Sequence, residues 1–387
     1  MIKKTILTIT VLSSLFSAAN ADYMQQMRDF QNYKASQEDQ FDTYQKAQMK
    51  AFEEYKKEIG VFWEKPKLST KKSWLSYSED KKTRSDVDFE KNTIVVETVA
   101  ASEEEAKRNL QTALAKAVTI DTKTLQETDP LEKKLAKIKL PSDMIHSKVD
   151  SKPILSTVVF DKKPTLNAVK KYVNKHTADS KIKVKESNKV QHARVYSVSV
   201  QLPDDTMLKR SKLYLNDVEE HAAKRDLPKP LIFAIMHSES SFNPRARSHI
   251  PAYGLMQIVP NTAGRDTYKF LYKQDKLVSG SYLYNSKNNI KMGSAYLHIL
   301  YYRYLKKIKN PDSRLYCTIA AYNTGAGNIA YAFTKKYNMN NAAPIINKLT
   351  PEEVYARLLK DLRFDEPKHY LKKVSKRMAA YKKVYGI

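Results

Sequence analysis

The sequence contains few of the residues that form covalent or metal cross-links. Cys317 is the only cysteine in 387 residues, which excludes an intramolecular disulfide framework and a cysteine-rich metal cluster. Its apolar helical surroundings predict a buried core residue. No pair of histidines has the spacing of a zinc site, so we expect no bound metal. Walker, Rossmann and Ser-His-Asp signatures are also absent, and we expect no cofactor.

Glycine is scarce as well. The eight glycines make up about 2% of the chain, against a usual ~7%. Six of them lie between residues 254 and 327. Where glycine is this rare, such a cluster indicates backbone conformations or close approaches that other residues cannot reach. We expect these glycines to lie mostly where a ligand rests against the backbone.

Acidic residues are in deficit. Lys plus Arg number 68 and Asp plus Glu 42, a net charge of +26, and residues 204–387 hold 32 basic and 15 acidic residues. This charge indicates a polyanionic partner, which could be a nucleic acid, an anionic lipid or an acidic polymer. A hydrophobic content of 42% excludes a disordered chain, and the length allows two domains of ordinary size.

The first residues have the pattern of an export signal. A basic start at Lys3 and Lys4 precedes an apolar run from Thr5 to Phe16, and an Ala-x-Ala sequence ends at Ala21. We predict a signal peptide over 1–21 that is cleaved after Ala21. A short membrane anchor is the weaker alternative, because the run is short for a bilayer. We expect no lipid anchor, since no cysteine stands at the cleavage point, and export argues against a nucleic-acid partner.

Residues 22–62 read as a long helix with an internal repeat. Phe30, Phe41 and Phe52 are eleven residues apart, and so are Tyr33, Tyr44 and Tyr55. An eleven-residue period keeps the Phe-x-x-Tyr pairs on one nearly straight face. Two interpretations remain open: an amphipathic helix packed on the rest of the protein, or a helix that binds a partner or a membrane surface.

Residues 80–203 alternate between strand and helix patterns. Val87 to Phe89 and Thr93 to Val99 flank a turn at Lys91-Asn92, as in a hairpin. Ser102 and Glu105 form a capping box before a helix through Leu110 and Leu114. Further segments are a helix at Thr165 to His176 and strands at Lys183 to Lys185 and Arg194 to Leu202. We predict an α+β domain over 22–203, led by the long helix, that acts as a scaffold or targeting module.

From residue 204 the pattern becomes almost wholly helical. The predicted helices are Asp205 to Arg225, Lys229 to Ser240, Ile290 to Leu305, Ser313 to Tyr322, Pro351 to Leu359 and His369 to Tyr385. We therefore expect an α+β protein overall, with an all-α domain over 204–387.

Glu239 is the first candidate for catalysis. On the predicted helix from Lys229 to Ser240 it shares one face with Ile232, Ile235 and Met236. A poorly solvated carboxyl has a raised pKa, and a general acid needs one near neutral pH. By itself this pattern also fits a structural carboxyl that is paired with Arg245 or Arg247.

Several motifs follow Glu239 in order. Residues 239–244 read ESSFNP, residues 253–260 read YGLMQIVP, residues 320–328 read AAYNTGAGN, and Glu366 precedes Tyr370 by four residues. Together they resemble the lytic transglycosylase family with a lysozyme-like fold, over about 204–387. The N-terminal part, with its Phe-x-x-Tyr helix and α+β unit, is similar to the N-terminal domain of one membrane-bound member type. The missing lipid-anchor cysteine departs from that type.

The resemblance implies a role for Glu239 as the single catalytic acid and base. It would protonate the glycosidic oxygen between N-acetylmuramic acid and N-acetylglucosamine. It would then take the proton of the muramoyl 6-hydroxyl as that oxygen attacks the anomeric carbon, which leaves a 1,6-anhydro sugar. A substrate that supplies its own nucleophile makes a second carboxylate unnecessary.

The resemblance also implies a set of substrate-binding residues. They are Ser248, Met256, Gln257, Tyr322, Asn323, Glu366 and Tyr370. Structural alternatives stay open for a turn serine at 248, a core methionine at 256, a packing tyrosine at 322 and an ion-paired Glu366. Pro367 stands where the family often has threonine, which puts Glu366 in more doubt than Tyr370.

The sequence therefore predicts a periplasmic peptidoglycan lytic transglycosylase in cell-wall turnover. Its expected partners are glycan strands, with other cell-wall enzymes and electrostatic contact with a membrane surface as further options, and no nucleic acid. The alternatives are a muramidase that uses water, as in goose-type lysozymes, an inactive wall-binding scaffold, and a binder of nucleic acid or anionic surfaces.

Overall fold

The computed structural model describes residues 28, 35–36, 38–160, 162–248 and 251–386. The predicted signal peptide, Phe30 and Tyr33 lie outside these residues. Contacts divide the chain into two units, one within 1–54 and 134–143 and the other within 55–133 and 144–387. The predicted boundary at 203/204 falls inside the second unit and stays a prediction.

Residues 38–60 are helical and carry the described part of the eleven-residue repeat. In the smaller unit, Phe41 is 3% exposed, and the Gln40 side-chain oxygen accepts hydrogen bonds from the backbone and hydroxyl of Ser142. In the larger unit, Tyr55 is 2% exposed and packs edge-on against Tyr77. The packed-helix interpretation is therefore confirmed at these positions. None of the described helices is long and apolar enough to cross a membrane.

The larger unit contains a five-stranded antiparallel sheet within the described residues, in the order β1-β2-β3-β5-β4. The strands are β1 (Ser73–Tyr77), β2 (Thr83–Asp88), β3 (Thr93–Ala100), β4 (Lys183–Glu186) and β5 (Arg194–Gln201). The predicted hairpin is confirmed: Asp88 pairs with Thr93, and Asn92 takes the positive φ of the turn, at 55°.

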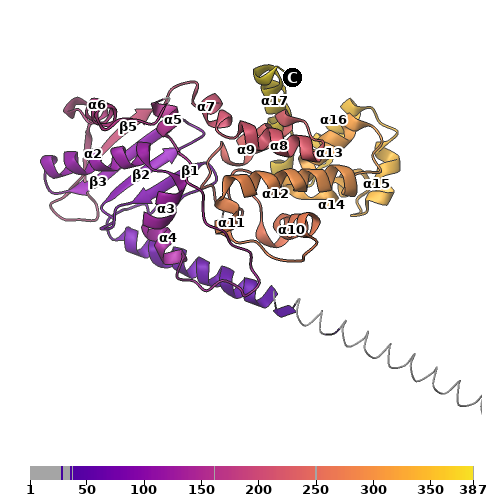
Figure 1. Cartoon of the computed structure of the whole chain (residues 1–387), viewed down its shortest axis with the longest axis horizontal. Coiled ribbons are helices and arrows are strands. Elements are labelled where there is room, and N and C mark those ends of the chain that lie inside the picture. The colour runs from indigo at the N-terminus through magenta and orange to yellow at the C-terminus, as the bar shows by residue number, and fades with distance from the viewer. Residues whose placement is uncertain (1–27, 29–34, 37, 161, 249–250, 387) are drawn as a thin grey trace, which may run out of the picture. The chain divides into compact units, whose positions relative to one another are not determined.

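Helix α2 (Glu103–Thr119) covers one face of the sheet (Figure 1). Leu110 and Leu114 fill the layer beneath it and are fully buried. The predicted Ser102 cap is confirmed, because its hydroxyl accepts from the Glu105 backbone at 3.2 Å. The Glu105 carboxylate accepts in turn from the backbone of Ala101 rather than of Ser102.

Short helices complete this part of the chain. They are α3 (Thr122–Thr128), α4 (Pro130–Leu135), α5 (Ser156–Val159), α6 (Leu166–His176) and the 3-10 turn η1 (Asp179–Lys181). The helix and the two strands predicted between residues 165 and 202 are confirmed as α6, β4 and β5.

From residue 206 on, the described chain is helical, and Figure 1 shows α7 leading from the sheet to these helices. The helices are α7 (Thr206–Lys212), α8 (Leu215–Arg225), α9 (Lys229–Ser240), α10 (Arg265–Tyr272), α11 (Gly280–Tyr284), α12 (Ser286–Ile299), α13 (Pro311–Thr324), α14 (Ala326–Thr334), α15 (Met339–Ile346), α16 (Pro351–Asp361) and α17 (Asp365–Tyr385), with π-helical turns η2 (Pro260–Gly264) and η3 (Leu300–Tyr304). Sheet and helices together confirm the predicted α+β class.

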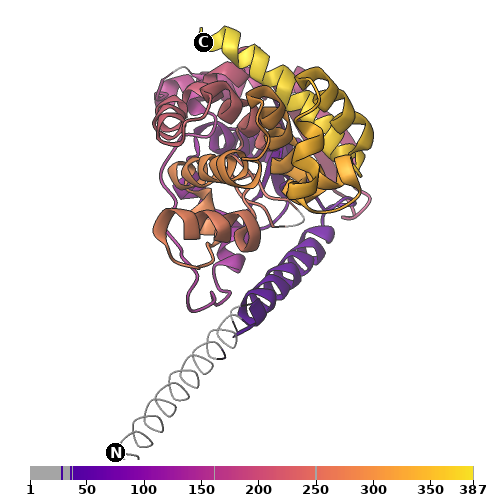
Figure 2. The same ribbon diagram turned by 90° about the vertical axis from the view of Figure 1, so that its right-hand side faces the viewer.

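The helices before and after residue 227 differ in how well the sequence predicted them. The single helix expected from Asp205 to Arg225 is wrong, because the chain breaks at Leu213 and Tyr214, where the fully buried Tyr214 ring stacks on Phe242. The helix from Lys229 to Ser240 is confirmed at both ends. It lies in the core, and α17, which ends near the C-terminus marked in Figure 2, packs against it. Tyr381 and Tyr385 of α17 stack on Phe233 of α9.

Arg245 connects the segment after α9 to the short helices beside the sheet. Its guanidinium forms an ion pair with Glu132 of α4 at 2.6 Å and a hydrogen bond to Gln126 of α3 at 2.7 Å. It also lies 3.7 Å from the centre of the Tyr284 ring, and the side chain is 3% exposed. The sheet part and the helical part of the chain therefore share a buried ionic contact next to the Glu239 helix.

We expect Arg245→Met to lower the free energy of unfolding by about 3 kcal/mol, because the change leaves the Glu132 carboxylate poorly solvated and without its cation. Chemical denaturation followed by circular dichroism measures this loss. The matched control is Arg108→Met, which breaks an ion pair of equal length, 2.6 Å, with Glu104 at the surface. Both of those side chains are more than half exposed, so its loss should stay below about 0.5 kcal/mol. Equal losses for the two variants would contradict the role given to Arg245.

Candidate active site

The catalytic candidate Glu239 lies in the last turn of α9. Pro230 lies in the first turn of this helix, where its missing backbone N–H costs no hydrogen bond. Ser241 and Phe242 end it with positive φ angles of 51° and 61°, which turn the chain away from the helix axis. Residues 231–236 are fully buried, so the helix is fixed along its length and holds the Glu239 carboxyl in place.

Glu239 is 7% exposed and forms no ion pair with any described residue. The pairing with Arg245 or Arg247 that the sequence left open is wrong, since Arg245 pairs with Glu132 instead. Burial raises the pKa of Glu239, and the charge of Glu366 raises it further, while Lys71 and the Tyr370 hydroxyl act in the opposite direction. The net raised pKa keeps this carboxyl protonated at a higher pH than an exposed glutamate.

Two tyrosines face this carboxyl. The Tyr370 ring is 8% exposed, and its hydroxyl lies beside Glu239 but completes no well-aligned hydrogen bond with any described residue. The Tyr322 hydroxyl donates to the Met256 carbonyl oxygen at 2.8 Å. Burial and the nearby Glu239 charge raise the pKa of both phenols well above the usual value, so both stay neutral hydrogen-bond donors.

Asn289 holds the segment around Met256 in place. Its side-chain oxygen accepts from the Met256 backbone at 2.8 Å, and its side-chain nitrogen donates to the carbonyls of Tyr253 and Leu283, also at 2.8 Å. A Cβ at Gly254, where φ is 73°, would collide with this amide. Asn289 was not among the predicted site residues. Its side chain is fully buried, and a buried polar side chain on an otherwise apolar helix face needs hydrogen-bond partners such as these three backbone groups.

Gln257 has a side-chain oxygen without a hydrogen bond among the described residues, whereas the Met256 side chain is enclosed in the core. Gln257 adopts a positive φ of 50°, and its side-chain nitrogen donates to the Gly254 carbonyl at 3.0 Å. Its side-chain oxygen is buried and has no hydrogen-bond partner among the described residues. The Met256 side chain has no exposed surface and packs on Gly293, which favours the alternative of a core methionine.

We expected the clustered glycines to lie mostly where a ligand rests against the backbone, and this expectation is wrong for two positions. Gly254 and Gly293 are required by internal packing, since a Cβ at either would strike Asn289 or Met256. Gly325 fits the expectation: it has a φ of 84°, and a Cβ there would meet nothing within 4 Å. Gly325 and Gly327 line a surface groove of about 440 Å³ together with Tyr296, Tyr304 and Tyr337. Tyr296 packs edge-on against Tyr322, which connects this aromatic groove to the surroundings of Glu239.

Three further predicted residues are Ser248, Asn323 and Glu366, and of these Glu366 acts on Glu239 through its charge. The Ser248 hydroxyl accepts from the backbone of Ala252 at 3.2 Å across a turn whose residues 249–250 are outside the described part. Asn323 is half-buried near the end of α13, and Glu366 is exposed in the first turn of α17. The roles of Ser248, Asn323 and Glu366 stay predictions.

Charged side chains from the sheet part complete the surroundings of α9. The Glu90 carboxylate accepts from Lys72 at 2.8 Å and from Lys373 of α17 at 3.0 Å, and these cations lower its pKa to about 2. Arg377, one turn further along α17, donates to the His237 carbonyl at 2.9 Å and to the Ser238 hydroxyl at 3.1 Å. Sequence reasoning missed this set, because its members are far apart in the chain.

His237 has a structural role rather than that of a metal ligand. One of its ring nitrogens lies 3.1 Å from the Tyr381 hydroxyl, and burial lowers its pKa to about 3, so it stays neutral. Within the described residues there is no group of three or more His, Cys, Asp or Glu side chains that could hold a metal ion. Cys317 is fully buried, as predicted.

Parts of this chain match known protein families. Residues 217–344 match the family described as Transglycosylase SLT domain, and residues 41–213 match the family described as Membrane-bound lytic murein transglycosylase C, N-terminal domain. Membrane-bound lytic murein transglycosylase C of Serratia proteamaculans is 35% identical over 313 residues, 81% of this chain and 83% of that protein. The chain belongs to this family. It is therefore a lytic transglycosylase that acts on murein, the peptidoglycan of the cell wall.

The chain is also similar to a second relative and to a solved structure. Membrane-bound lytic murein transglycosylase C of Klebsiella pneumoniae is 35% identical over 318 residues, 82% of this chain and 83% of that protein. The solved 70-kDa soluble lytic transglycosylase of Escherichia coli is 27% identical, with a TM-score of 0.36, over 47% of this chain and 26% of that one. The alternative of an inactive scaffold does not fit the family, whose members are named as enzymes.

We expect kcat/KM for wall cleavage to fall on the alkaline side with a midpoint above about 4.3, the reference pKa of a glutamate, because burial keeps Glu239 protonated. Lys71→Met removes a positive charge that lowers this pKa, so the midpoint should move to higher pH. A pH–rate profile on purified wall measures both. The matched control Lys67→Met removes a lysine that pairs with Asp86 and should leave the midpoint in place. An unchanged midpoint in Lys71→Met would contradict the electrostatic role of Lys71.

Proposed function

We propose that this enzyme cleaves the β-1,4 bond between N-acetylmuramic acid and N-acetylglucosamine without water, with Glu239 as its single acid and base. The observation that carries the proposal is a buried carboxyl without an ion pair, beside two neutral phenols. The other carboxyl of comparable burial among the described acids is Asp129, which bonds to Ser76 on the sheet. A mechanism with one carboxyl therefore fits these surroundings.

The reaction begins with Glu239 in its protonated form. Its proton passes to the glycosidic oxygen, and the bond between that oxygen and the anomeric carbon breaks. The 6-hydroxyl oxygen of the muramoyl residue bonds to the anomeric carbon, and its proton returns to the Glu239 carboxylate. The product carries a 1,6-anhydro ring and no water is consumed, whereas ordinary glycosidases need two carboxyls for the two roles.

Neighbouring groups fit the polar atoms of an N-acetylated sugar. The Tyr370 hydroxyl has no well-aligned partner among the described residues, so it is available to donate to the sugar or to the developing charge. The unpaired side-chain oxygen of Gln257 is available to accept from an acetamido N–H. The tyrosines of the aromatic groove offer apolar faces on which neighbouring sugar rings can stack. We keep Ser248, Asn323 and Glu366 as further substrate-binding residues.

We place the mature enzyme in the periplasm, after cleavage of residues 1–21. The relatives are named membrane-bound, which gives no support to the expected absence of a lipid anchor, so that absence stays a prediction. The net charge of +26 suits attraction to an anionic wall or membrane surface, as well as contact with other cell-wall enzymes. Such attraction weakens as salt is added.

We expect Glu239→Gln to lower the rate of wall cleavage by roughly 10²- to 10⁴-fold, because an amide cannot supply the proton. The measurement is mass spectrometry of the fragments released from purified peptidoglycan. With wild type the fragments should end in the 1,6-anhydro sugar, lighter by one water molecule than a reducing end. The matched control is Glu352→Gln, an exposed glutamate of α16, which should cleave like wild type.

Three outcomes would contradict the proposal. Reducing ends as the main product would favour a muramidase that uses water. Full activity of Glu239→Gln would mean that another residue is the acid. Loss of wall binding together with loss of cleavage in this variant would mean that Glu239 holds the substrate rather than protonates it.

A further inference from the structure

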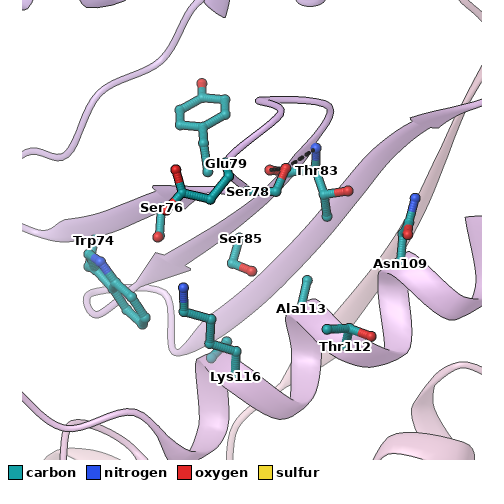
Figure 3. A pocket seen from close by; sticks show the side chains of 12 residues that line it. Trp74, Ser76, Ser78, Glu79, Thr83, Ser85, Asn109, Thr112, Ala113 and Lys116 are labelled. Atoms are coloured by element: carbon teal, nitrogen blue, oxygen red, sulfur yellow. Dashed lines mark hydrogen bonds between the residues drawn. The ribbon is translucent and has the colours of Figure 1, made fainter. Parts of the chain in front are cut away.

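A second cavity lies away from Glu239, between the sheet and α2. Its volume is about 300 Å³, at the lower end of the range for ligand pockets. Figure 3 shows its wall of side chains from β1 and β2 on one side and from α2 on the other. None of the predicted catalytic or substrate-binding residues lines it. The wall-cleaving function therefore leaves this cavity without a role.

The sheet face that lines the cavity changes from apolar to hydroxyl side chains along β1 and β2. In the register of β1 and β2, Trp74 lies opposite Val87, and the next pair on the same face is Ser76 opposite Ser85. These four side chains are at most 8% exposed. The face thus passes from apolar side chains, which pack under α2, to short hydroxyl side chains that cannot fill the same layer. Buried hydroxyls need polar partners. The Ser76 hydroxyl already donates to the Asp129 carboxylate at 2.9 Å, whereas the Ser85 hydroxyl has no such partner among the described residues.

Helix α2 presents short side chains to the same place. Leu110 and Leu114 belong to the core between sheet and helix, whereas Ala113 and Ala117 line the cavity together with the two serines. Because both layers use small residues here, the space between them stays open. Protein interiors are otherwise packed to near-crystalline density, so an open space with a polar lining is a feature of a binding site rather than of a core.

The lining offers hydrogen-bond donors without partners. Within the part of the chain that the structure describes, Lys116 forms no ion pair and the Ser85 hydroxyl makes no hydrogen bond. The Lys116 side chain extends from α2 toward β1 and β2 (Figure 3). The one acidic side chain of the lining, Glu79, already pairs with Lys133 at 2.7 Å. The charge of Lys116 also helps to lower the pKa of Glu79, but the two side chains form no ion pair. The cavity therefore presents a cation without an ion pair and a hydroxyl without a hydrogen bond among the described residues.

We propose that this cavity binds the carboxylate end of a short peptide, with Lys116 as the counter-ion and Ser85 as a hydrogen-bond donor. The Trp74 ring and the two alanines provide the apolar surface for the adjoining side chain. Peptidoglycan carries stem peptides that end in a carboxylate, so the proposal rests on the proposed function for the choice of peptide. It assigns the N-terminal domain a binding site for the peptide part of the substrate whose glycan part is cleaved at Glu239.

The test is calorimetric titration of the wild-type chain, lacking only residues 1–21, with the stem tripeptide L-alanyl-γ-D-glutamyl-meso-diaminopimelate. This peptide has no glycosidic bond, so the result does not depend on catalysis. We expect saturable binding at one site per chain. The same peptide with its terminal carboxylates converted to amides should bind at least tenfold more weakly, because Lys116 then loses its counter-ion.

Variants locate the binding in the cavity. Ala113→Leu fills the space and should abolish saturable binding of the peptide. Ser85→Val removes the hydroxyl donor but keeps a strand-forming residue, so it should weaken binding of the peptide. This second variant serves as the test if Ala113→Leu does not fold. Lys116→Ala should weaken binding roughly threefold to tenfold. The matched control is Lys107→Ala, since Lys107 lies on the same helix outside the cavity and pairs with Asp179 at 2.8 Å. Lys107→Ala should bind the peptide and cleave wall like wild type.

Three results would overturn the proposal. The first is no saturable binding of the tripeptide. The second is binding that Ser85→Val and Lys116→Ala leave unchanged, which would place the peptide elsewhere. The third is competition for the cavity by the peptide-free disaccharide, which would make it a sugar site. None of these results bears on the products of wall cleavage, so a failure here is distinct from a failure of the proposed function.

Discussion

The structure depends on keeping one carboxyl buried without a cation in contact. A buried glutamate that formed an ion pair would be held in its charged form and could not act as an acid near neutral pH. Arg245, the basic residue nearest in the chain to Glu239, is drawn away by Glu132 and by the ring of Tyr284. The fold therefore pairs the Arg245 cation with Glu132 rather than with Glu239. The free energy lost by desolvating the Glu239 carboxyl is offset by the packing of the helix that carries it.

Internal packing near Glu239 accounts for Gly254, one of the glycines between residues 254 and 327. Around Gly254 the chain must pass close to Asn289, whose amide fixes both sides of the segment with three hydrogen bonds. That segment in turn accepts the Tyr322 hydroxyl through the Met256 carbonyl. A phenol beside Glu239 is thus positioned by a carbonyl, the carbonyl by an asparagine, and the asparagine by the absence of a Cβ.

The sequence alone predicted the elements whose pattern is local. The α9 bounds, the β2–β3 hairpin and the Ser102 cap depend on residues within a few positions of each other, and all three are confirmed. The break between α7 and α8 was missed, because it follows from the burial of Tyr214 against Phe242 and not from a helix breaker. Glu239 could be named as a candidate because its motif is contiguous, whereas Lys71, Glu90 and Arg377 were missed because only the tertiary fold brings them to α9.

These distant contacts change how the N-terminal part of the chain should be viewed. A scaffold or targeting module needs no contact with the Glu239 helix, yet Arg377 joins the last turn of α9 to the cations that surround Glu90. Lys71, beside them, lowers the pKa of Glu239, and its carbonyl accepts from Asn243 just past the end of α9. A displacement of the β1 edge would therefore alter the proton affinity of the Glu239 carboxyl. The N-terminal part of the chain thus belongs to the electrostatic environment of Glu239.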